Sequence, residues 1–165
     1  MKEKQIQIQL CLLSGVALAA LLVAVSVFYP LYKEEPSVIY QIEESGSSSL
    51  IGYSEGNIGW LVLALTIVLS ISIVPAVLIK KEKSYRLIGY LSIFSGVLLA
   101  IVSILSIKIV DRIRLSRLIT ALPTGEVSMA SGIYLLVGGT LLLCIFGITL
   151  VWSNRKNSLG FRSIY

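Results

Sequence analysis

The chain has 165 residues, of which 56% are hydrophobic and 14% are charged, and its formal net charge is +5. The mean hydropathy of +0.89 is too high for a soluble domain, and the charged residues cluster between long uncharged runs, as in membrane proteins. There is no histidine, and the two cysteines stand alone in apolar runs, which disfavours haem, zinc and dithiol redox sites. We therefore expect no cofactor, no bound metal and no enzymatic activity.

Four apolar segments are long enough to cross a bilayer, which needs about 20 residues per helix. We predict a single domain, residues 1–165, with spans at residues 10–29, 58–79, 87–110 and 133–152. The first segment is longer than the apolar region of a signal peptide, so we expect it to be retained. The fold class predicted is an all-α membrane protein, a bundle of four transmembrane helices.

The first and third segments resemble each other. Residues 10–19 read LCLLSGVALA and residues 91–100 read LSIFSGVLLA, with identity at six of the ten positions. The second and fourth segments begin alike more faintly, and each ends at a basic cluster. These similarities predict a tandem repeat of a helical hairpin, and chance similarity between apolar sequences is the alternative.

Small residues spaced four apart let helix backbones approach closely in lipid. We expect the first and third helices to meet along such faces, or to contact their hairpin partners there, and the fourth helix to form a further close contact. The predicted helix-packing residues are Gly15, Ala19, Gly96, Ala100, Gly132 and Gly139. Pro75 is expected to kink the second helix.

The loop after the first span, residues 30–57, contains two β-prone runs at residues 37–43 and 47–54 around a Ser/Gly turn. This pattern is typical of a small β-hairpin, and a disordered loop is the alternative. The loop after the third span, residues 111–132, begins with interleaved apolar and basic residues. Either the third helix projects past the membrane, or a short amphipathic helix lies at the interface.

Opposite charges on these two loops would bring them together as one outer cap, in which acids of the first loop pair with arginines of the second. Solvated charges and headgroup contacts are the alternative. The residues expected to form an interaction surface on this cap are Glu34, Glu35, Glu43, Glu44, Arg112, Arg114 and Arg117.

The orientation follows from the distribution of Lys and Arg. If both termini and the loop at residues 80–86 are cytoplasmic, nine Lys and Arg lie inside and five outside. We therefore predict a multi-pass cell-membrane protein with cytoplasmic N- and C-termini. Membrane topology accounts for the positive net charge, and the sequence shows no basic face with base-reading or stacking groups. We therefore expect no nucleic-acid partner.

Ionisable residues inside spans are the usual markers of transport, and Lys108, near the end of the third span, is the only one here. The favoured hypothesis is a non-catalytic accessory or scaffold subunit, which contacts the lipid bilayer and other membrane subunits or self-associates. The alternative is a small oligomeric transporter or channel with a hydroxyl-lined path. A third hypothesis is a membrane enzyme or a quinone- or lipid-binding subunit.

Overall fold

The computed structural model describes residues 2–34, 47–51, 57–79, 82–119 and 127–160. Its helices are α1 (Lys2–Ser26), α2 (Asn57–Ile79), α3 (Glu82–Ile119) and α4 (Ser131–Gly160), and its strands are β1 (Pro30–Glu34), β2 (Ser47–Ser49) and β3 (Val127–Met129). Each of the four helices is long and apolar enough to cross a membrane. The predicted four-helix membrane fold is thereby confirmed, and the chain is a multi-pass integral membrane protein.

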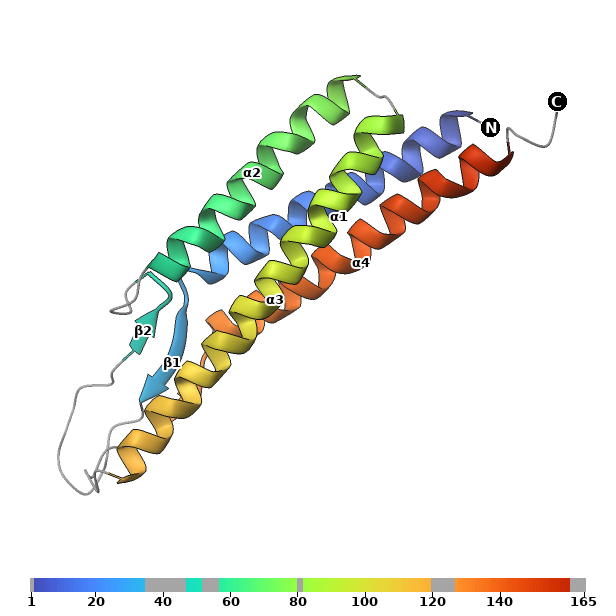
Figure 1. Ribbon diagram of the computed structural model, residues 1–165. Coiled ribbons are helices and arrows are strands. Elements are labelled where there is room, and N and C mark those ends of the chain that lie inside the picture. The colour runs from blue at the N-terminus through green and yellow to red at the C-terminus, as the bar shows by residue number, and fades with distance from the viewer. Residues whose placement is uncertain (1, 35–46, 52–56, 80–81, 120–126, 161–165) are drawn as a thin grey trace.

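The four helices run alternately up and down, so that both chain ends, the end of α2 and the start of α3 lie at one end of the bundle (Figure 1). The strands lie at the opposite end. Helix α4 packs most extensively against α3 and α1, whereas α2 packs less extensively against α3 and α1. Helices α1 and α3 hardly touch, because they lie diagonally across the bundle.

The core lies where α4 meets α1 and α3. Its largest fully buried side chains include Leu13, Leu99, Leu136, Leu143 and Leu150. Helix α2 is the least buried span, since only 22% of its apolar window is buried compared with 39% for α3. Lipid is as apolar as these side chains, so the contacts of α2 depend on packing and not on the hydrophobic effect.

The three strands form one antiparallel sheet in the order β2-β1-β3. Tyr32 of β1 is paired with Ser48 on one side and with Met129 on the other. Beyond β3, the backbone N–H of Ala130 donates to the carbonyl oxygen of Leu31 at 2.9 Å. The sheet therefore joins the two loops through backbone hydrogen bonds.

Strands β1 and β2 pair with each other, but they do not coincide with the two runs of the predicted hairpin. Strand β1 begins at Pro30, directly after α1, whereas the predicted first run at residues 37–43 lies outside the described residues. Strand β2 falls within the predicted second run but covers Ser47–Ser49 only. Strand β3, which completes the sheet, was not predicted.

Helix α3 continues without a break to Ile119, so the projecting helix is the correct one of the two alternatives. The span boundary predicted at residue 110 marks the end of the apolar run and not the end of the helix. Val110 and Val127 are buried, and Ile113 packs against the core. Helix α3 also contacts β1 and β3 of the sheet. We call the sheet together with residues 110–119 the cap.

Candidate functional site

The α1–α4 contact contains three of the predicted packing residues. A Cβ atom added to Gly139 would lie 2.6 Å from Cγ2 of Val23 and 3.3 Å from the carbonyl oxygen of Ala19, and one added to Gly15 would lie 2.7 Å from Cε1 of Phe146. Gly15 and Ala19 of α1 therefore lie against α4.

The α3–α4 contact contains Gly96, where an added Cβ would lie 2.5 Å from Sγ of Cys144. The two backbones also approach closely at Gly89 and Gly147, because a Cβ on either would lie 3.1 Å from the carbonyl oxygen of the other. Neither glycine was among the predicted packing residues. Ala100 is half-buried in α3.

Gly132 has a different role from the one expected. A Cβ on this residue would lie 2.7 Å from the carbonyl oxygens of both Tyr29 and Pro30. Gly132 therefore lets the start of α4 lie directly against the turn between α1 and β1.

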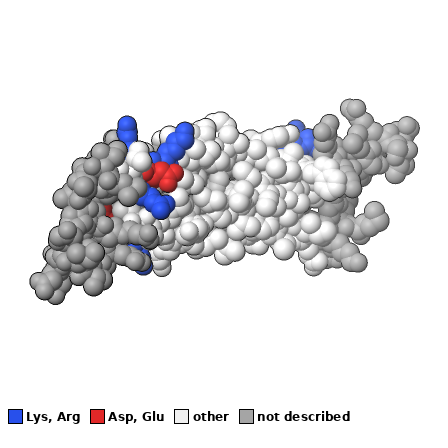
Figure 2. Space-filling model, turned by 90° about the horizontal axis from the view of Figure 1, so that it is seen from below, with Lys and Arg blue, Asp and Glu red and all other residues white. Residues whose placement is uncertain are grey.

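The predicted charges of the cap are only partly described. Glu34 is half-buried on β1, and Arg112 and Arg114 are exposed on α3. The side chain of Arg117 and the residues Glu35, Glu43 and Glu44 lie outside the described part, so the predicted ion pairing of the two loops stays a prediction. On the face in Figure 2, the charged side chains lie toward the two ends of the molecule, and the band between them is uncharged.

A buried polar cluster at the end of the bundle that carries the termini was missed by sequence reasoning. The side chains of Gln9 and Asn154 are 5% and 0% exposed, and Nε2 of Gln9 donates to Oδ1 of Asn154 at 2.6 Å. Asn154 Nδ2 donates to the carbonyl oxygen of Leu150 at 2.8 Å, and Arg86 Nη2 donates to the carbonyl oxygen of Asn154 at 3.4 Å. The cluster thereby links α1, α3 and α4.

Most described hydroxyls inside the spans donate to a carbonyl oxygen of their own helix, three or four residues earlier. They are Ser14, Ser26, Thr66, Ser70, Ser72, Ser103, Ser106 and Thr149. Three described buried hydroxyls have no partner, namely those of Tyr85, Ser92 and Thr140. Hydroxyls that are bonded to their own helix have already used their one donor.

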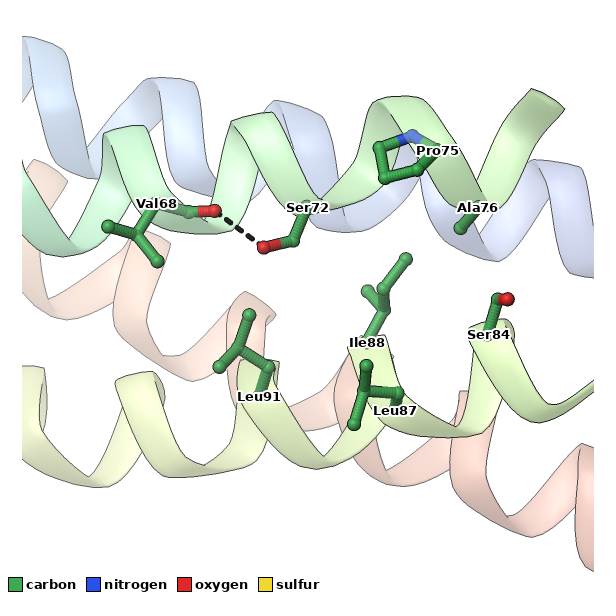
Figure 3. Close-up of a pocket in the computed structure, with 8 residues that line it drawn as sticks. All are labelled: Val68, Ser72, Pro75, Ala76, Ser84, Leu87, Ile88 and Leu91. Atoms are coloured by element: carbon green, nitrogen blue, oxygen red, sulfur yellow. Dashed lines mark hydrogen bonds between the residues drawn. The ribbon is translucent and has the colours of Figure 1, made fainter. Parts of the chain in front are cut away.

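An apolar groove of about 360 Å³ lies between α2 and α3 near the termini, and it is partly open to the outside (Figure 3). Helix α2 contributes the side chains of Val68, Ser72, Pro75 and Ala76. Helix α3 contributes those of Ser84, Leu87, Ile88 and Leu91. The Oγ atom of Ser72 donates to the carbonyl oxygen of Val68 at 2.7 Å, so the lining contains little free polar chemistry.

No group of three or more His, Cys, Asp or Glu side chains could hold a metal ion within the residues that the structure describes. No protein-family model matches the chain, and no curated protein is significantly similar to it. The geometry therefore defines a class only, a four-span membrane protein with a helix-and-sheet cap, a buried amide pair and a lateral apolar groove.

Proposed function

We propose that the protein is a non-catalytic accessory or scaffold subunit of the cell membrane, which packs beside a larger membrane complex or against copies of itself. The observation that carries this proposal is the chemistry of the bundle interior. Its described buried polar residues are Gln, Asn, Ser and Thr, with no Asp, Glu, Lys or Arg among them. Transport and proton paths usually need such ionisable groups.

The surfaces of the molecule support the same proposal. Helix α2 turns large side chains outward, including Ile67, Ile71 and Val74, and these can meet either lipid or the helix of a partner. The cap adds exposed charges at Arg112 and Arg114 on a helix that is braced by the sheet. A rigid charged cap above an apolar helix face suits contact with a partner that also crosses the membrane.

The transporter or channel alternative has less support. It needs a continuous polar path, whereas most described hydroxyls bond to their own helices, and the exceptions are separate side chains on α3 and α4. Under our proposal, purified protein in liposomes conducts no ion and no small solute. Flux that disappears when Ser92 and Thr140 are replaced by Ala would favour the alternative.

We propose cytoplasmic termini because nine of the fourteen Lys and Arg would then lie inside. A single-cysteine variant at Lys83 tests this orientation against one at Arg112, since both side chains are exposed at opposite ends of α3. Both variants carry Cys11→Ser and Cys144→Ala. In intact cells, an impermeant thiol reagent is expected to label position 112 and not position 83. The reverse pattern would contradict the orientation.

Photo-crosslinking in native membranes tests the subunit proposal itself. A photoreactive amino acid is placed at Ile71, on the exposed face of α2, or at Arg112 on the cap. Leu136, which is fully buried, serves as the control position. We expect a discrete heavier adduct from an exposed position and none from the control. If both exposed positions yield only lipid and intrachain products, the proposal is wrong.

A further inference from the structure

The apolar groove between α2 and α3 adjoins the end of the bundle where both chain termini lie. Its lining residues lie within the candidate membrane spans of both helices, so we take the medium outside it to be lipid. We propose that this groove holds one acyl chain of a phospholipid from the adjacent leaflet, whose anionic headgroup lies beside Lys83. This proposal is independent of the subunit function above.

The lining of the groove selects a hydrocarbon chain. Val68, Leu87 and Leu91 supply apolar walls, and the hydroxyl of Ser72 is already bonded within α2. The only polar side chains among the described lining residues are Ser72 and Ser84, so a polar solute or an ion would lose most of its hydration there for few new partners, which is costly. An acyl chain has no such cost.

The hollow exists because small side chains lie between the walls. Ser72 and Ala76 of α2 face Ser84 and Ile88 of α3 across the gap, as Figure 3 shows. A chain in this hollow is contacted by both helices, whereas a chain on the convex surface is contacted from one side. More atom contacts give more dispersion energy, so a chain in the groove should be held longer than the surrounding lipid.

The charge at the end of the groove selects the headgroup. Lys83 is exposed in the first turn of α3, directly before the lining residue Ser84. The sequence KKEKSYR at residues 80–86 has four basic residues and one acid. Arg86 is half-buried and donates to the carbonyl oxygen of Asn154, whereas Lys83 is exposed, so Lys83 is the more accessible of these two cations to a phosphate.

The test uses full-length protein in detergent, titrated with phosphatidylglycerol or phosphatidylcholine of identical chains, and counts retained lipids by native mass spectrometry. Ser72→Leu fills the groove. Ser70→Leu is the matched control, because Ser70 is exposed on the same helix and donates to its own helix in the same way. We expect one lipid to be retained by the wild type and by Ser70→Leu, and none by Ser72→Leu.

The headgroup part of the proposal is tested by Lys83→Gln. This variant should lower the preference for phosphatidylglycerol over phosphatidylcholine about fivefold, the effect of one lysine near an anionic surface. The total number of retained lipids should not change at saturating lipid. An unchanged preference would overturn the assignment of Lys83.

A second measurement needs no variant. Wild-type protein in nanodiscs is labelled by a phosphatidylglycerol with a photoreactive acyl chain, and the labelled peptides are mapped. Enrichment at residues 68–76 and 84–91 over the exposed face of α4 is expected. Uniform labelling, or equal lipid retention by Ser72→Leu and Ser70→Leu, would overturn the proposal. So would a dimer that Ser72→Leu disrupts without changing the lipid count.

Discussion

Two adjacent glycines of α4 allow a sharp test of the packing, because they differ in what surrounds them. A Cβ on Gly139 would lie 2.6 Å from Cγ2 of Val23, 3.2 Å from the backbone nitrogen of Val23 and 3.3 Å from the carbonyl oxygen of Ala19. A Cβ on Gly138 would meet nothing within 4 Å. Alanine should therefore be tolerated at Gly138 and disfavoured at Gly139.

The magnitude follows from these distances. Carbon atoms normally pack about 3.5–4.0 Å apart, and the buried side chain of Val23 is restricted to one main rotamer in a helix, so α1 must move. Overpacking costs about 1–3 kcal/mol, and replacing a helical glycine by alanine offsets about 0.5–1 kcal/mol. The difference between these two terms leaves a loss of up to about 2.5 kcal/mol in the free energy of unfolding for Gly139→Ala. Gly138→Ala should leave it unchanged or raise it by up to about 1 kcal/mol.

Reversible unfolding in mixed micelles with increasing SDS measures both variants under identical conditions, and helical circular dichroism reports the transition. Gly138→Ala is the control for Gly139→Ala, since both variants add one methyl group to the same turn of α4. Equal stabilities for Gly138→Ala and Gly139→Ala would refute the close contact between α1 and α4.

Three further predictions concern groups that the structure places away from these glycines. Gln9→Ala and Asn154→Ala should each destabilise the bundle, and a double-mutant cycle should give a coupling free energy of about 1 kcal/mol between them. The control Gln7→Ala, on the exposed face of α1, should be neutral. A coupling near zero would contradict the buried amide pair. Tyr85→Phe removes a buried hydroxyl that has no partner, so the unfolding free energy should stay constant or rise by up to about 1 kcal/mol; a loss of that size would mean that the hydroxyl is bonded. Ala130→Pro removes the backbone N–H that donates to the carbonyl oxygen of Leu31, so proteolysis of the cap should become faster. Ala130→Gly keeps this N–H and should accelerate proteolysis less.

The spans could be predicted because hydropathy reports directly on the cost of placing a residue in lipid. The same property could not place the helix ends. The charged stretch after Val110 ends the apolar run, but the chain remains helical to Ile119, and α3 contacts β1 and β3. Strand β3, Val127–Met129, is too short to give an alternating pattern, and its partner β1 is distant in the sequence.

The faces of the helices could be predicted only in part. Gly15 and Gly96 were recognised as small contact residues, but their shared partner, α4, depends on how the four helices are arranged. Gln9 and Asn154 resemble ordinary polar residues at the ends of spans when they are read separately. Their burial becomes visible only when α1 and α4 are placed side by side, so the sequence offered no signal for the pair.

We propose that this bundle works as a partner subunit beside other membrane proteins or copies of itself. The most direct test is the mass of the particle that contains the tagged chain when it is extracted from native membranes in a detergent-free polymer. We expect one discrete particle, with a fixed ratio of this chain to a second membrane protein or to further copies of itself. A particle that holds a single chain with lipid only would contradict it.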